Sequence, residues 1–424
     1  MSSAHSALDT PNPAVGSPSI LLFATTWWPL STRLAVRLRN LGASVSALVP
    51  RHHMMQAVSG LTAIHRLRPL SIPQSIRRAI FVSRPDLIVP TDDTAVWLLH
   101  DIAQRFPELT SLIERSLGSR EHYGTLSSRR QFLALAQSLG ILCPLTSQLH
   151  LSARLDAIVA QSQFPVVLKN DGTSGGYGVV IARNADQLRR GYRLLLRHRL
   201  PLRKFKRLLI NGDVASLYHA DSSPPDEITT QSFIPGTPAN GLFVAQRGQI
   251  LAHLAVRVER SLSETGASVV VDRIHHPGML AAAEKLAARL ELSGFFGLDF
   301  ILNAETGEPW LLEINPRATQ LCHIPLTSLL DPSQNAFATL ADAIYFVAAG
   351  HAPPQLPQQP IHARFAFFPQ ALTLASDDSV LASAVLDRPD EEPELVAELL
   401  RPAWPQRRPW LRLYNRMLRR INRR

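Results

Sequence analysis

The sequence predicts an α/β protein in which a domain built on a parallel sheet precedes lobes of mixed α+β structure. Three observations carry this prediction. Apolar runs and helical segments alternate over the first hundred residues, which is the pattern of βαβ units. A lysine-bearing apolar run then leads into a glycine-rich loop, at residues 166–178. Two further apolar runs, 295–303 and 309–317, carry regularly spaced polar residues.

Length and composition are typical of a multidomain globular protein. The 424 residues allow two or three domains, and no apolar run reaches the roughly 18 residues of a membrane span. Residues 1–18 lack the regions of a signal peptide, and their small residues and prolines predict a disordered leader. Cys143 and Cys322 lie far apart and make no disulfide framework or metal motif, which favours the cytoplasm.

The net charge of +10 belongs to the C-terminal tail. Residues 401–424 contain nine arginines and no acidic residue, so removing them lowers the net charge to +1. A specific nucleic-acid site on the body is therefore not expected. The tail also has helical apolar spacing, which predicts a basic amphipathic helix. Such a helix can contact an anionic membrane or an acidic carrier protein. The alternative, slightly favoured for its apolar face, is a helix docked on its own domain.

The N-terminal segment predicts a parallel sheet with a ligand-binding edge. Strands are expected at 20–25, 44–50 and within 85–93, with a helix after the first strand. Loops at the carboxyl ends of parallel strands line ligand crevices, which places Trp28 and Asp92 at that edge. Asp92 and its neighbour Asp93 can equally cap the following helix, and capping is the favoured interpretation.

The remaining elements alternate between helix and strand, and no internal repeat occurs. The clearest helix is alanine-rich, at 278–294, with Gly294 as its expected end. Residues 200–227 give no assignment, and the proline-rich segment 352–400 predicts an appended subdomain. The other expected elements are helices 127–140, 152–162 and 184–198, and strands 144–149, 229–236 and 242–258, with a turn at Arg247 and Gly248.

The loop after Lys169 is longer and richer in glycine than a hairpin requires. Residues 171–178 contain four glycines, whereas hairpin loops need two to five residues. Glycine allows backbone N–H groups to converge on an anion. The segment therefore predicts either a flap over phosphates or a flexible hairpin tip.

The strand at 309–317 places three polar residues on one face. Because side chains alternate with period two, Glu313, Asn315 and Arg317 share a face, and burying them unpaired would cost several kcal/mol. The preceding strand supplies Asp299 among apolar neighbours. Two carboxylates and an amide oxygen are ligands that Mg²⁺ uses alongside phosphate oxygens. The alternative is an internal salt bridge from Arg317 to Asp299 or Glu313.

The ordered set of a lysine strand, a glycine-rich flap, "QSFIPG", an acidic strand and "EINPR" resembles the ATP-grasp superfamily. The likeness is to carbamoyl-phosphate synthetase large-chain and biotin-carboxylase-like members. It covers about residues 19–350 and is weaker over the first hundred. No single motif is diagnostic, but the ordered set is specific.

The resemblance implies a pre-ATP-grasp βαβ domain, a two-lobed ATP-grasp domain and a small C-terminal extension. The expected boundaries, together with the leader and the tail given above, are 19–118 for the first domain, 119–351 for the ATP-grasp domain (small lobe about 143–232, large lobe about 233–351) and 352–400 for the extension.

The resemblance also implies a site for ATP and Mg²⁺ (or Mn²⁺). Arg317 and Lys169 are the implied catalytic residues, Arg317 facing the transferred phosphate and Lys169 reaching the nucleotide. The metal ligands are Asp299, Glu313 and Asn315. The implied nucleotide contacts are Arg129, Lys169, the flap residues Ser174, Gly175 and Gly176, and the hinge residues Gln231, Ser232, Phe233 and Ile234.

Two departures from the family pattern stand out. Ser232 replaces an acidic hinge residue, so backbone groups alone would contact the adenine amino group. The stretch 200–227 is also longer and more basic than a small lobe requires. Neither departure removes the metal or phosphate residues.

The family's reaction is ATP-dependent ligation, in which a carboxylate becomes an acyl phosphate that an amine or similar nucleophile captures. A phosphotransferase and a non-catalytic nucleotide-binding module are the alternatives. Candidate substrate residues are Arg257, Trp28, Asp92 and His323, although a salt-bridged arginine, a core tryptophan or a structural histidine would look the same. The expected partners are small-molecule substrates, with homodimerisation as an open expectation.

Overall fold

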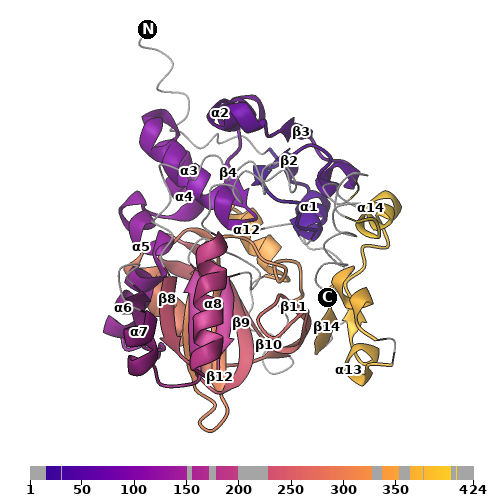
Figure 1. Cartoon of the computed structure of the whole chain (residues 1–424). Coiled ribbons are helices and arrows are strands. Elements are labelled where there is room, and N and C mark those ends of the chain that lie inside the picture. The colour runs from indigo at the N-terminus through magenta and orange to yellow at the C-terminus, as the bar shows by residue number, and fades with distance from the viewer. Residues whose placement is uncertain are drawn as a thin grey trace.

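The computed structural model describes residues 16–29, 31–149, 155–170, 178–198, 228–326, 337–352, 363–375, 377–402 and 407. Within these ranges the strands form a four-stranded N-terminal sheet, a second four-stranded sheet and a seven-stranded sheet (Figure 1). Helices flank these sheets. The predicted α/β class is confirmed, and the three sheets meet around one cavity.

The N-terminal sheet is parallel, with the strand order β3-β2-β1-β4. Its central strands are apolar on both faces. Leu21 and Phe23 pack into a core with the helices of this domain, whereas Ile20 and Leu22 pack into a core shared with the large sheet. The elements are β1 (Ser19–Phe23), α1 (Ser31–Asn40), β2 (Ser44–Val49), β3 (Ala63–Arg66), α2 (Ile72–Ser83), β4 (Leu87–Pro90), α3 (Asp93–Arg105) and α4 (Thr110–Leu117).

Two helices lead from this domain into a smaller antiparallel sheet, with the order β5-β8-β6-β7. Helix α8 covers one face of this sheet (Figure 1), where Leu188 and Leu195 join Leu168 in a buried core. The elements are α5 (Tyr123–Ser127), α6 (Arg129–Ser138), β5 (Thr146–Leu149), α7 (Leu155–Gln161), β6 (Val166–Asn170), β7 (Val179–Ala182), α8 (Ala185–His198) and β8 (Ile228–Ser232).

The large sheet has the order β13-β12-β9-β10-β11-β14-β15. Phe243, Phe296 and Leu286 pack together on the face covered by α11. Leu242 and Val244 pack on the other face, in the core shared with the N-terminal domain. The elements are β9 (Gly236–Gln246), β10 (Gln249–Ser261), β11 (Ser268–Ile274), α11 (Pro277–Arg289), β12 (Gly294–Asn303), β13 (Pro309–Asn315) and α12 (Leu340–Ala349).

The alanine-rich helix is shorter than the sequence predicts. It ends at Arg289, with Leu290 as its C-cap, so the predicted end at Gly294 is wrong. Gly294 instead begins β12 with φ +95°, and a Cβ atom there would lie 2.2 Å from the carbonyl oxygen of Ser116. The glycine is required because the strand starts against the end of α4 in the N-terminal domain.

The described part of the C-terminal segment extends the large sheet. Strand β14 pairs with β11, and β15 pairs with β14. The elements are β14 (Arg364–Ala366), α13 (Ser379–Ala382), β15 (Val385–Leu386) and α14 (Pro393–Leu399). The domain boundaries remain predictions. The unassigned stretch 200–227 and nearly all of the basic tail lie outside the described residues.

Candidate active site

A cavity of about 470 Å³ lies where the three sheets meet. The N-terminal domain contributes the loops after β1 and β4. The smaller sheet contributes β6, β7 and the segment after β8, and the large sheet contributes β9, β12, β13 and the β10–β11 hairpin. The predicted hinge residues line this cavity: Gln231, Ser232, Phe233 and Ile234. The predicted metal ligands Asp299, Glu313 and Asn315 line it as well, together with Lys169.

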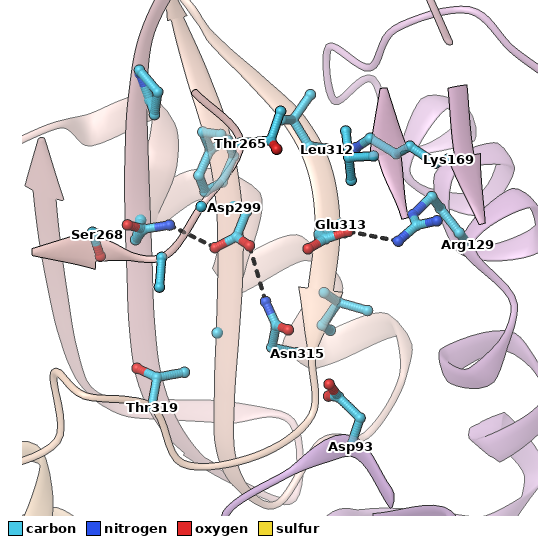
Figure 2. Close-up of a pocket in the computed structure, with 18 of the residues that line it drawn as sticks. Asp93, Arg129, Lys169, Thr265, Ser268, Asp299, Leu312, Glu313, Asn315 and Thr319 are labelled. Atoms are coloured by element: carbon cyan, nitrogen blue, oxygen red, sulfur yellow. Dashed lines mark hydrogen bonds and ion pairs between the residues drawn. The ribbon is translucent and has the colours of Figure 1, made fainter. Parts of the chain in front are cut away.

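Three polar side chains stand in one row across neighbouring strands of the cavity floor. Asn240 on β9 is in register with Asp299 on β12, and Asp299 is in register with Glu313 on β13. Asn240 donates a hydrogen bond from Nδ2 to Asp299 Oδ1 at 2.7 Å, and Asn315 donates to Asp299 Oδ2 at 3.2 Å (Figure 2). Directly opposed cross-strand residues lie close together, so sheet register alone assembles this polar row.

The two carboxyl groups of the row differ in their electrostatics. Burial raises the pKa of Asp299 above its usual range, and the negative charge of Glu313 raises it further. Burial would also raise the pKa of Glu313, but the charges of Arg129 and Lys169 more than offset it and lower this pKa. The pair therefore resists carrying two negative charges unless a further cation is present.

Two cations approach the row from the other side of the cavity. Arg129, in the first turn of α6, donates from Nη2 to Glu313 Oε2 at 2.8 Å (Figure 2). Ser128 is the N-cap of this helix, because its side chain accepts a hydrogen bond from Gln131 N. The cap fixes the start of the helix and therefore the position of Arg129. Lys169 on β6 is 6% exposed and lies on the same side as Arg129. The cavity thus has acidic groups on one side and basic groups on the other. This arrangement suits an anionic ligand that is bound together with a metal cation.

Arg317 follows β13 and contacts the N-terminal domain. Its Nε and Nη2 donate to the carboxylate of Asp93, at 2.7 and 3.3 Å. Asp92 is the N-cap of α3 and accepts from Ala95 N at 2.9 Å. The favoured capping interpretation is therefore correct for Asp92, while Asp93 pairs with Arg317. The alternative bridge from Arg317 to Asp299 or Glu313 is not what the structure shows.

Two hydrogen bonds join Ser232 of the hinge segment to Leu145. Ser232 N donates to Leu145 O at 3.0 Å, and Leu145 N donates to Ser232 Oγ at 3.1 Å. Phe233 and Ile234 line the cavity beside apolar side chains of β6, β7 and β12: Val167, Val179, Ile181 and Ile301. An apolar slot beside the hinge segment suits a planar base.

Asp299 and Glu313, together with the nearby Asn315, suit a hard divalent cation. Two carboxylates and an amide oxygen match the part of a Mg²⁺ or Mn²⁺ shell that a protein supplies when phosphate oxygens supply the rest. Among the described residues, no group of three or more His, Cys, Asp and Glu side chains could hold a metal by itself.

Most predicted site residues come together, but two do not. Trp28, Asp92, Arg129 and Arg317 also line the cavity. Arg257 and His323 are not among its described lining residues, and both have acidic partners. Arg257 pairs with Glu259 and Asp272, and His323 pairs with Asp387 at 3.1 Å. The flap residues Ser174, Gly175 and Gly176 lie outside the described residues.

Sequence reasoning missed the role of two residues. Asn240 belongs to no recognisable motif. It lies beside Asp299 only because β9 pairs with β12. The sequence places Asp93 at the end of a strand, but no local pattern predicts its ion pair with Arg317, which lies 224 positions away. Both depend on contacts between segments distant in sequence.

Comparison with known proteins identifies the domain and the fold. A family model described as an ATP-grasp domain matches residues 211–320. No curated protein sequence matches the chain. Similar solved structures include an L-amino acid ligase from Bacillus licheniformis, with 11% identity, a TM-score of 0.55, and coverage of 78% of this chain and 74% of that one.

Two further similar structures contain bound nucleotide. N5-carboxyaminoimidazole synthetase from Staphylococcus aureus, complexed with ADP, has 13% identity, a TM-score of 0.55, and coverage of 80% and 79%. The biotin carboxylase domain dimer of Hydrogenobacter thermophilus 2-oxoglutarate carboxylase, complexed with MgADP, ADP and bicarbonate, has 14% identity, a TM-score of 0.54, and coverage of 79% and 70%.

The resemblance predicted from the ordered motifs is thereby confirmed for the domain and the fold. The expectation of an enzyme that uses ATP with Mg²⁺ agrees with the matched domain and with the chemistry of the cavity. Residues 211–320 thus match an ATP-grasp domain, and the chain shares the fold of these solved structures.

Proposed function

We propose that the protein is an ATP- and Mg²⁺-dependent ligase that activates a carboxylate as an acyl phosphate for capture by an amine or similar nucleophile. One observation carries the proposal. The cavity brings the Asn240–Asp299–Glu313 row together with Arg129, Lys169 and Arg317 beside an apolar slot.

In the first step a carboxylate oxygen of the substrate attacks the γ-phosphorus of ATP. The bond from that phosphorus to the β–γ bridging oxygen breaks, and ADP leaves with the electron pair. Lys169 and Arg129 would neutralise phosphate charge, and Arg317 would face the transferred group. Asp299, Glu313 and Asn315 would hold Mg²⁺, which when bound supplies charge neutralisation at the phosphate oxygens.

In the second step the nucleophile attacks the acyl carbon. Phosphate departs with the electron pair of its bridging oxygen, and an amine nucleophile loses a proton as the amide forms. Aromatic and apolar side chains that line the cavity, including Trp28, Trp97 and Leu321, would limit water access. Restricting water matters because an acyl phosphate hydrolyses readily.

The test is phosphate release from Mg·ATP in the presence of pooled carboxylic acids, amino acids and amines, beside the Glu313→Ala variant. We expect substrate-dependent release that falls to background in Glu313→Ala, together with a product whose mass equals acid plus amine minus water. A phosphorylated acceptor without phosphate release would identify a phosphotransferase instead. Tight Mg·ATP binding without any turnover would favour a non-catalytic module.

The partner and location predictions belong to the same proposal. The expected partners are small molecules, and homodimerisation and contact of residues 401–424 with a membrane or an acidic carrier protein remain proposals. Among the described helices, none combines the length and the apolar character that crossing a bilayer demands. A cytoplasmic location is proposed on the absence of disulfide-forming cysteine spacing.

A further inference from the structure

We propose that Asp93, a residue of the N-terminal domain, is a positioning residue that orients Arg317 for the phosphoryl-transfer step. This inference rests on the proposed function and deepens it, because it assigns a role in that step to the parallel-sheet domain. It is carried by the contacts of Asp93, of its neighbour Asp92, and of Arg317.

The two adjacent carboxylates are used in different ways. Asp92 accepts hydrogen bonds from Thr25 N at 2.6 Å, Thr25 Oγ1 at 2.7 Å and Ala95 N at 2.9 Å. Its oxygens are thus occupied within the N-terminal domain, where they tie the loop after β1 to the start of α3. Asp93 is the first residue of α3, and its carboxylate contacts the guanidinium of Arg317 in the cavity.

The contacts of Arg317 determine which edge of its guanidinium faces the cavity. Nε and Nη2 engage Asp93, and Nη2 also donates to Asn315 Oδ1 at 3.2 Å. Nη1 has one long contact, to Ala318 O at 3.5 Å. The two-point fork that a carboxylate normally takes is therefore occupied by Asp93. Nη1 is left as the edge that can meet an oxygen of the transferred phosphoryl group.

Backbone contacts keep this arrangement in place. Ala318 N donates to Pro90 O at 3.1 Å, which ties the segment after β13 to the end of β4. Pro90 ends β4 and Asp93 begins α3, so both partners of the ion pair are anchored to one short piece of the N-terminal domain. An arginine held in this way needs no reorientation when charge develops in the transition state.

The same contacts link the N-terminal domain to the metal residues. Asp93 contacts Arg317, Arg317 contacts Asn315, and Asn315 contacts Asp299. Loss of Asp93 would leave a partly buried cation with a long, flexible side chain and a less defined orientation.

The experiment measures the affinity for ADP in Mg²⁺ with and without aluminium fluoride, which mimics the transferred phosphoryl group. Asp93→Asn, Arg317→Gln and the double variant are compared with the wild-type chain. Asp101→Asn is the matched control, because Asp101 lies on the same helix and pairs with Arg105. Thermal unfolding of each variant checks that the fold is retained.

We expect the affinity for Mg·ADP to change less than about twofold in Asp93→Asn. The factor by which aluminium fluoride tightens ADP binding should fall about tenfold or more in this variant. The double variant should lose no more tightening than Arg317→Gln alone, because Asp93 acts through Arg317. Asp93→Glu, which keeps the charge, should recover part of the lost tightening. Asp101→Asn should behave as the wild type does.

Three results would overturn the inference: normal tightening in Asp93→Asn, losses that add in the double variant, or equal losses in Asp93→Asn and Asp93→Glu. A wild-type chain that binds Mg·ADP but shows no tightening would overturn it as well, since Arg317 would then not meet the transferred group. A wild-type chain that fails to bind Mg·ADP would instead contradict the proposed function.

Discussion

At the scale of single residues, the site shows what strand periodicity can and cannot predict. Glu313 and Asn315 are predicted from alternation along one strand, and Asp299 from its apolar neighbours. Asn240 and Asp93 could not be predicted in these roles. Asn240 reaches Asp299 only because β9 pairs with β12, although β10, β11 and α11 separate these two strands in the sequence. Asp93 reaches Arg317 only because the segment after β13 packs against the N-terminal domain.

Loss of the Lys169 charge should weaken ATP binding. Replacing Lys169 with methionine keeps the buried methylene packing but removes the charge, so nucleotide phosphates lose one charge-assisted contact. Such contacts are worth about 1.5–3 kcal/mol, so we expect Lys169→Met to weaken ATP binding about 10- to 100-fold. Fluorescence titration with ATP measures this directly.

Lys285→Met is the matched control for that titration. The Lys285 ammonium is exposed and donates to Leu139 O at 3.0 Å, outside the cavity. ATP affinity should be unchanged in this variant. Equal affinities in Lys169→Met and in the wild-type chain would contradict a phosphate-binding role for Lys169.

At the scale of elements, local signals locate strands and helices better than they locate their ends. The alternating pattern of 309–317 and the apolar run of 295–303 correspond to β13 and β12. The helix before β12 ends at Arg289 rather than at the predicted glycine. Gly294 is required by a close approach to the N-terminal domain, and no local pattern signals such a contact between distant segments.

The close approach of Gly294 to the Ser116 carbonyl predicts that a larger residue at position 294 destabilises the protein. In Gly294→Ala the new Cβ would lie 2.2 Å from Ser116 O at a φ of +95°, so both the packing and the backbone would be strained. We expect a loss of about 3 kcal/mol in the free energy of unfolding, measured by urea titration.

Gly350→Ala separates the two causes of that loss. Gly350 also has a positive φ, of +73°, but no atom lies within 4 Å of the position of a Cβ. This variant should lose only about 1 kcal/mol, from the backbone conformation. A similar loss in both variants would show that contact with Ser116 is not what selects Gly294.

At the scale of the whole molecule, helix α1 links segments from both ends of the chain. Arg33 pairs with Asp387 at 3.6 Å, Arg37 pairs with Asp342 at 2.8 Å, and Arg39 pairs with Glu392. The three acidic partners are buried, so the C-terminal segment is part of the packed molecule. These ion pairs could not be predicted from the sequence, because pairing over more than 300 positions leaves no local pattern.

The polar row of Asn240, Asp299 and Glu313 lies across three neighbouring strands of the large sheet and lines the cavity. If this row holds a metal with a nucleotide, Mg²⁺ must strengthen ADP binding through Glu313. Calorimetric titration with ADP, in Mg²⁺ and in chelator, tests this without knowledge of the substrates. Glu308→Gln is the matched control, because Glu308 is exposed at the turn between β12 and β13.

We expect Mg²⁺ to raise the ADP affinity of the wild-type chain and of Glu308→Gln alike. In Glu313→Gln the gain from Mg²⁺ should fall about tenfold or more, because a charged ligand becomes neutral, while the affinity in chelator should change much less. A wild-type chain that binds no ADP, or a gain from Mg²⁺ that survives intact in Glu313→Gln, would contradict the account.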